Sequence, residues 1–270
     1  MIPQWVLMTA PYARLRGIPI VLWYTHSAVT WKLRMAHHCA QRILTASPES
    51  YRLPHGDKVR ILGHGIDTEY FRPAPRPPDG MLRVLSVGRL SPVKQHEVLV
   101  EAARILVQER GMASLQVRIV GGPALPSDEE YALRLRQMVV DHGLKGHVVF
   151  SGPVPYDKVV SEYQDCDLFV NPSRTDSLDK VALEAMACGL PVVTSNPAMG
   201  SLLTEGCSGL FFPHRDPWAL AEAIIEIAAL PFRQRHQLGL DLRRRVEQGH
   251  SLERLMDRIV QEFRELTCSD

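Results

Sequence analysis

The sequence predicts an α/β protein built on doubly wound parallel sheets. Strand-like apolar runs alternate with helical patterns along nearly all of the 270 residues, which is the order expected when helices cross between parallel strands. Several strands end in glycine or polar residues, as they do where ligands approach the carboxyl edge of such a sheet. The stretch from Pro73 to Gly80 contains four prolines and is the convincing interdomain linker.

Each element follows from its apolar period and from the turn residues that end it. In chain order, strands are expected at 18–26, 42–46, 58–62, 82–88, 115–120, 147–150, 168–170, 191–195 and 209–212. Helices are expected between them at 28–39, 92–106, 127–141, 156–165, 178–187, 216–229, 232–248 and 252–266. Ser127 with Glu130 predicts a capping box, and Asp216 predicts an N-cap. Gly189 and Pro191 end the helix 178–187.

Composition indicates a globular protein without a polyanionic partner. The formal net charge is +1, from 31 basic and 30 acidic residues, so no global field favours nucleic acid or more than peripheral membrane contact. The five cysteines lack the spacing of a disulfide framework or a metal site, which is typical of a reducing compartment. No uncharged run reaches the roughly 20 residues of a membrane span. The apolar start lacks the marks of a secretory signal and is expected to be part of a core helix. We therefore expect a cytoplasmic protein, with the inner face of the membrane as the alternative location.

The most informative stretch runs from the strand 168–170 to the strand 191–195. Asn171 should end the first strand, and a helix then begins between two acidic residues, Asp176 and Glu184. Both acids therefore lie near a helix N-terminus at the carboxyl end of a parallel strand. Free backbone N–H groups favour anions there, and open α/β sheets bind their ligands at this edge.

A second segment supplies the opposite charge. The strand 82–88 ends in a glycine, Gly88, and Arg89 and Lys94 follow around a turn. Glycine lets a ligand approach the backbone, while arginine can grip phosphate oxygens bidentately and lysine adds a point charge. Cations at one strand end, with carboxylates and helix N–H groups at another, suit a diphosphate joined to a polyhydroxyl group.

Four segments in this order resemble the retaining GT-B glycosyltransferases of the family 4 type, the glycosyl transferases group 1. They are residues 88–94, Gly121-Gly122, 150–152 and 184–193. The resemblance implies a complete Rossmann-like nucleotide-sugar domain at 75–250 and a partial, acceptor-side Rossmann-like domain at 1–74. The helix 251–270 would cross back onto the first domain or pack within its own. The glycine-rich acceptor loop of the first domain is absent, so we expect an enzyme that lacks most of that domain.

The resemblance also assigns roles to individual residues. Arg89 and Lys94 would hold the diphosphate, Glu184 the ribose, and Asp176 and His26 the donor sugar. Further contacts with the donor are expected from Gly88, Gly122, Val154, Ser177, Leu178 and Asp179. The sequence departs from the family at Asp176, where glutamate followed by Gly-Phe-Gly is usual. The resemblance therefore supports the role of Asp176 less strongly than that of Glu184.

Each of these residues has a simpler interpretation. Arg89, Lys94 and Glu184 could be solvated surface charges, and His26 a structural hydrogen-bonding residue. Asp176 could be the helix N-cap instead of a sugar ligand.

Other polar motifs are expected to be structural. Asp179 and Lys180 would form a local ion pair, and His64 would be a turn residue. Asp165-Cys-Asp167 resembles the metal-binding motif of a different glycosyltransferase fold. It joins a helix end to a buried strand, and we expect no metal site there or at His37-His38.

The function implied by the resemblance is hexosyl transfer from a nucleotide-diphosphate sugar to a carbohydrate or lipid-linked acceptor. Configuration at the sugar would be retained, and neither a metal nor a cofactor would be needed, since the nucleotide sugar is the donor substrate. One alternative is a remnant that binds the donor without efficient transfer. Another is a different GT-B enzyme, such as a sugar-nucleotide epimerase. The sequence names neither the base, the sugar nor the acceptor.

Overall fold

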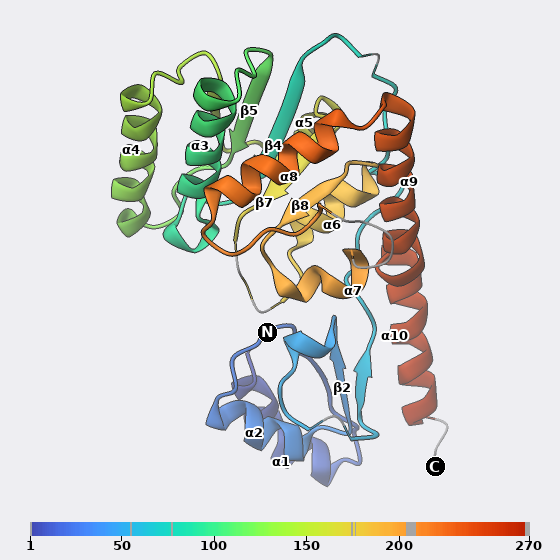
Figure 1. The fold of residues 1–270 in the computed structure, drawn as a ribbon. Helices are drawn as coiled ribbons and strands as arrows, with labels where there is room; N and C mark the ends of the chain where they lie inside the picture. Colours follow the sequence, from blue (N-terminus) through green and yellow to red (C-terminus); the bar gives the residue numbers. More distant parts are fainter. Residues whose placement is uncertain are drawn as a thin grey trace. The chain divides into compact units, whose positions relative to one another are not determined.

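The computed structural model describes residues 2–54, 56–76, 78–173, 175, 177–203 and 209–267 (Figure 1). By their contacts the residues form two compact units. The first comprises Met1–Asp67, Asp176–Leu178 and Gln248–Asp270, and the second comprises Thr68–Thr175 and Asp179–Glu247. The first boundary therefore falls after residue 67, ahead of the position after residue 74 expected from the linker. None of the described helices is long and apolar enough to cross a bilayer.

The first unit is built on a three-stranded parallel sheet. Its strands are β1 (Val21–Trp23), β2 (Arg42–Thr45) and β3 (Val59–Ile61), hydrogen-bonded in that order. Its helices are α1 (Gln4–Leu15), α2 (Trp31–Cys39), the short 3₁₀ turn η1 (Pro48–Ser50) and α10 (Leu252–Thr267). The Thr30 hydroxyl caps α2 by accepting a hydrogen bond from the Leu33 N–H.

Side chains that alternate along these strands bury both faces of the sheet. Leu22 and Ile43 share one hydrophobic cluster with Leu33 of α2. Leu44 lies in a second cluster with Leu255 of α10, because successive strand residues point to opposite faces. A buried carboxylate completes the second contact: Glu262 of α10 accepts hydrogen bonds from the Nε atoms of Arg42 (3.0 Å) and Arg60 (3.1 Å). The last helix therefore belongs to the first unit.

The second unit contains a five-stranded sheet in which every pairing is parallel. The strands are β4 (Leu82–Val87), β5 (Leu115–Val120), β6 (Val148–Gly152), β7 (Leu168–Asn171) and β8 (Val192–Thr194), in the spatial order β6-β5-β4-β7-β8. The chain builds outward from β4 to β5 and β6, then returns to place β7 on the other side of β4. The carboxyl ends of β4 and β7 therefore flank a topological switch point, which is where open α/β sheets bind ligands.

Helices and short turns surround this sheet. They are η2 (Pro92–Lys94), α3 (His96–Arg104), η3 (Ile105–Glu109), α4 (Pro126–Asp141), α5 (Tyr156–Gln164), α6 (Lys180–Ala187), η4 (Pro197–Met199), α7 (Gly200–Leu203), α8 (Pro217–Ala229) and α9 (Phe232–Gly249). Helix α3 lies beside α4 and α8, and α6 packs against β7 and β8 (Figure 1). Central strand residues such as Val84, Val117 and Phe169 are fully buried and form the core.

The ends of β4 and β5 approach so closely that one position must be glycine. Gly121 has a φ of +132°, and a Cβ built there would lie 1.9 Å from the carbonyl oxygen of Gly88. The strands stay hydrogen-bonded at this point, since the Gly88 N–H donates to the Val120 carbonyl at 2.9 Å. The backbone is therefore tightly fixed at this edge of the sheet, where the sequence predicts the phosphate contacts.

Three local predictions were wrong. Helix α4 begins at Pro126 after Leu125, and Asp128 accepts the backbone N–H of Leu125, so Ser127 does not form the cap. Pro92 opens a 3₁₀ turn rather than the α-helix itself. The segment 209–212 makes only an isolated bridge, between Phe211 and Thr194, instead of a strand.

Candidate functional site

The turn after β4 places Lys94 over Gly88. A Cβ built on Gly88 would lie 3.5–3.6 Å from the Cε, Cδ and Cγ atoms of Lys94, so the lysine side chain runs along this glycine. Lys94 ends the 3₁₀ turn η2, and Gln95, with a φ of +51°, then reverses the chain into α3. A left-handed glutamine is uncommon. The backbone therefore adopts an unfavourable conformation next to the lysine.

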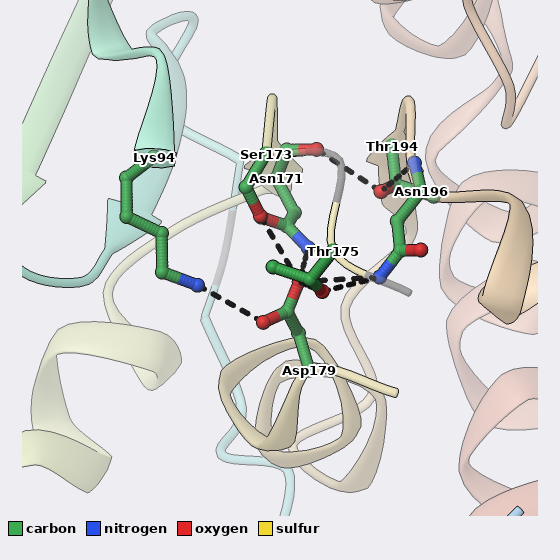
Figure 2. A network of polar contacts seen from close by, with 7 residues as sticks. All are labelled: Lys94, Asn171, Ser173, Thr175, Asp179, Thr194 and Asn196. Carbon is green, nitrogen blue, oxygen red and sulfur yellow. Dashed lines mark hydrogen bonds and ion pairs between the residues drawn. The ribbon is translucent and has the colours of Figure 1, made fainter. Parts of the chain in front are cut away.

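Lys94 meets a carboxylate from a segment 85 residues further along the chain. Its Nζ atom lies 2.9 Å from Oδ1 of Asp179, the N-cap residue of α6 (Figure 2). Both side chains are largely buried, with 18% of Lys94 and 12% of Asp179 exposed. The structure thus brings the end of the β4 segment to the N-terminus of the helix that follows β7. An ammonium group and a helix N-terminus are both able to bind anions.

The Asp179 carboxylate lies in a network of polar side chains. Its Oδ2 atom accepts hydrogen bonds from four donors, which come from the end of β7, the loop after it and the turn after β8 (Figure 2). The donors are Asn171 Nδ2 at 2.7 Å, Ser173 Oγ at 3.0 Å, Thr175 Oγ1 at 3.2 Å and Asn196 Nδ2 at 3.3 Å. Burial raises the pKa of Asp179, but the Lys94 charge and these hydrogen bonds lower it more, so its pKa lies below the ordinary value.

Arg89 is exposed just after β4. Within the part of the chain that the structure describes, no ion pair holds its guanidinium group. Arginine with five free donors in a planar fork suits phosphate oxygens better than an isolated point charge does. The exposed position therefore leaves the guanidinium group accessible to a ligand.

Glu184 lies one turn into α6 and is half-buried. Its Oε2 atom accepts a hydrogen bond from the Tyr163 hydroxyl at 2.8 Å, and the Tyr163 side chain is fully buried. Burial raises the pKa of Glu184 above the ordinary value, and the Tyr163 hydrogen bond opposes this shift only in part. A carboxylate held in one orientation by a buried tyrosine is well placed to accept hydrogen bonds from ligand hydroxyls.

The other predicted contacts are distributed along the carboxyl edge and in the first unit. Gly122 follows β5, where its carbonyl accepts the Leu90 N–H at 3.0 Å, and Val154 follows β6. By their contacts Ser177, Leu178 and His26 belong to the first unit. Asp176 lies outside the described residues. The roles of these last four residues stay predictions that rest on the resemblance alone.

Two expectations about the acidic cluster are corrected by the geometry. Asp179 forms its ion pair with Lys94 and not with the neighbouring Lys180, which is exposed. The N-cap of α6 is Asp179, so Asp176 does not hold that position. The helix begins two residues later than expected from the sequence.

Sequence reasoning missed the neutral side chains that surround Asp179. Asn171 was expected only to end a strand, and Ser173 and Asn196 were not among the predicted site residues. A signal was present, because polar residues follow two strands that prove to be neighbours, β7 and β8. The pairing of these two strands could not be assigned from one sequence.

Two polar side chains outside this cluster, those of Asp167 and His250, have structural partners. Asp167 accepts the Arg83 backbone N–H at 2.9 Å and pairs with Arg76. His64 is buried and donates its backbone N–H to His250 Nδ1 at 3.1 Å. Across the described ranges, no three His, Cys, Asp or Glu side chains gather as a metal site would require.

Comparison with known proteins places the chain in a family. A family model described as "Glycosyl transferases group 1" matches residues 82–229, more than half of the chain. The D-inositol 3-phosphate glycosyltransferase of Acidothermus cellulolyticus is 37% identical over 182 residues, which is 62% of this chain and 40% of the relative. That of Thermobispora bispora is 31% identical over 215 residues, which is 74% of this chain and 49% of the relative. The chain therefore spans at most about half the length of these relatives.

Solved structures agree on the fold. The crystal structure of Anabaena Alr3699/HepE in complex with UDP superposes with a TM-score of 0.82 at 19% identity, covering 97% of this chain and 77% of that one. Sucrose-phosphate synthase (tll1590) from Thermosynechococcus elongatus gives a TM-score of 0.77 at 22% identity, covering all of this chain and 79% of that one. The α/β class and the GT-B likeness predicted from the sequence are confirmed. The chain belongs to the glycosyl transferases group 1 family.

Proposed function

We propose that this chain binds a nucleotide-diphosphate sugar at the carboxyl edge of β4 and β7 and transfers its sugar to an acceptor hydroxyl with retention of configuration. The observation that carries the proposal is the meeting of Lys94 with the N-terminus of α6 at the switch point of the sheet. Family membership supports the reaction class, because the matched residues include the whole β4–α6 region.

The chemistry follows from where charge develops. Breaking the bond between the sugar and the diphosphate leaves negative charge on the departing phosphate and positive charge on the anomeric carbon. The Lys94 ammonium, the Arg89 guanidinium and the first N–H groups of α6 would stabilise the phosphate oxygens, and no metal ion is then needed. The Glu184 carboxylate would accept hydrogen bonds from the ribose hydroxyls, which fixes the nucleoside half of the donor.

Titration of nucleotides into the purified chain tests the proposal. Calorimetry with UDP, GDP and ADP should show one of the three binding with a Kd in the micromolar range, and the free nucleosides binding far more weakly. Turnover is then tested by hydrolysis of the matching nucleotide sugar, measured as the release of the nucleoside diphosphate. The proposal fails if none of the diphosphates binds at millimolar concentration to protein that is shown to be folded.

The raised pKa of Glu184 gives a prediction about pH. Ribose hydroxyls donate to the ionised carboxylate, so a protonated Glu184 must lose its proton before the nucleotide binds. Affinity should therefore fall as the pH drops through this raised pKa. Glu184→Gln should weaken binding about tenfold at neutral pH, the order of one hydrogen bond to a charged group. The affinity of Glu184→Gln should then vary with pH only through the titration of the ligand's own phosphates, whereas the wild type should show a further dependence.

The same residue predicts a stability change of defined sign. The folded chain keeps the Glu184 proton to a higher pH than the unfolded chain does, so this group reduces stability as the pH rises from below 4.5 through the folded pKa. Glu184→Gln should therefore unfold at an equal or higher urea concentration at pH 7. Glu129→Gln, at an exposed position in α4, is the matched control and should change neither affinity nor stability. Equal pH profiles for wild type and Glu184→Gln would contradict the ribose role.

A further inference from the structure

Asp179 is an N-cap residue that does not cap its helix. Aspartate at this position usually accepts a hydrogen bond from the second or third N–H of the helix, but the Asp179 side chain makes no such bond. Its carboxylate is turned away from the helix toward Lys94 and the polar side chains that follow β7 and β8 (Figure 2). The Asp179 carboxylate therefore holds the lysine instead of capping the N-terminus of the helix.

The carboxylate is fixed from several directions. Asn171, Ser173 and Asn196 are buried, and each lies within hydrogen-bond distance of a further polar group. Ser173 Oγ lies 2.7 Å from the Asn171 side-chain oxygen, and the Asn196 side-chain oxygen accepts the Ala198 N–H at 3.1 Å. Thr194 Oγ1 in turn accepts the Asn196 N–H at 3.0 Å. We therefore expect the carboxylate to keep its position when an anion approaches Lys94.

Donor and product differ in charge at the phosphate that would face this pair. In the donor the terminal phosphate is esterified to the sugar and carries one negative charge. Transfer breaks the bond from the anomeric carbon to this phosphate oxygen, which keeps the electron pair. The anomeric carbon bonds to the acceptor oxygen, whose proton passes to the departing phosphate or to solvent. The freed terminal phosphate then carries up to two negative charges.

On the basis of the proposed function, we infer that Asp179 is a specificity-determining residue that favours the nucleotide-sugar donor over the nucleoside diphosphate product. The fixed carboxylate shares the Lys94 charge with the ligand and repels the extra charge of the product more than it repels the donor. Asp179 thereby limits product inhibition and speeds the release of the nucleoside diphosphate. Without a charge at this position, the free lysine would hold the product more tightly.

Calorimetry on Asp179→Asn tests this role, with uridine, UDP-glucose and UDP as one ligand series and guanosine, GDP-mannose and GDP as another. For the series that binds, Asp179→Asn should raise the diphosphate affinity about tenfold, equal to about 1.4 kcal/mol. It should raise the nucleotide-sugar affinity less and leave the nucleoside affinity within twofold of wild type. Asp179→Gly also removes the charge and serves if the asparagine variant does not fold. Asp157→Asn, an exposed carboxylate on α5, is the matched control and should change no affinity.

The outcomes separate this role from a purely structural one. A gain in affinity that grows with ligand charge supports it. Unchanged or weaker diphosphate binding in folded Asp179→Asn and Asp179→Gly would overturn it, since Asp179 would then only aim the lysine. An equal gain for all three ligands would also overturn it, because charge would not be the cause. Binding of no ligand by wild type or variants would instead overturn the proposed function itself.

Discussion

On the proposed function, replacing Arg89 or Lys94 with methionine should lower kcat/KM for the nucleotide-sugar donor by about a hundredfold each. Each substitution would remove one preorganised donor to the departing phosphate, and such a donor typically stabilises the transition state by about 3 kcal/mol. Steady-state hydrolysis or transfer of the best donor measures the loss. Methionine keeps most of the apolar stem of both side chains, so the main change is the loss of the charged group.

The two variants differ in what they do to the fold. Arg89 is exposed and has no ion pair among the described residues, so Arg89→Met should keep the thermal stability of the wild type. Lys94→Met leaves Asp179 without its cation and should lower the melting temperature as well as the rate. Lys145→Met, at an exposed position before β6, is the matched control for the loss of one positive charge. An Arg89→Met enzyme with unchanged kcat/KM and unchanged product affinity would exclude Arg89 from the phosphate site.

Replacing Gly121 with alanine destabilises the second unit by about 3 kcal/mol or more, at the upper end of what one substitution costs. Two causes act together at this position. The backbone has a φ of +132°, which an alanine rarely adopts, and the new Cβ would lie 1.9 Å from the Gly88 carbonyl oxygen. The backbone of β4 or β5 must therefore shift where the two strands end. Urea unfolding followed by circular dichroism measures the loss.

The neighbouring glycine provides the control. A Cβ on Gly122 would lie 3.4 Å from Pro153 Cδ, and its φ is not left-handed, so Gly122→Ala should cost less than about 1 kcal/mol. Because Gly88 lies under Lys94, Gly121→Ala should also weaken nucleotide binding under conditions in which the protein is still folded. Equal stability of the two alanine variants would show that the strand ends are not as close as described.

Much of the fold could be predicted because local patterns agree with it. The strand 82–88 was predicted to within one residue of the observed β4 (Leu82–Val87), since its apolar run begins after turn residues and ends in a glycine. Errors arose where tertiary contacts decide the outcome. The segment 209–212 has a strand-like composition but finds only one bridging partner, Phe211 with Thr194. The chain reverses between η2 and α3 at Gln95, which has a left-handed backbone. Because this residue is not a glycine, the reversal could not be recognised from the sequence.

The charged residues of the site could be predicted from the sequence, but their ion-pair and hydrogen-bond partners could not. Lys94 and Asp179 were both singled out, yet the lysine that neutralises Asp179 is distant in sequence, whereas the adjacent Lys180 is the partner that local reasoning favours. The ion pair depends on β7 lying beside β4, and the order of the strands in the sheet cannot be deduced from either segment alone. The Tyr163–Glu184 hydrogen bond was missed for the same reason, because α5 and α6 meet only in the folded unit.

A crystal structure of the chain with its preferred nucleoside diphosphate tests the phosphate site most directly. The predicted result is a ligand whose phosphate oxygens lie within about 3 Å of the Lys94 ammonium and the Arg89 guanidinium, a normal hydrogen-bond distance, with the ribose hydroxyls on the Glu184 carboxylate. Phosphates bound away from both cations, or a ribose that does not contact Glu184, would contradict the assignment.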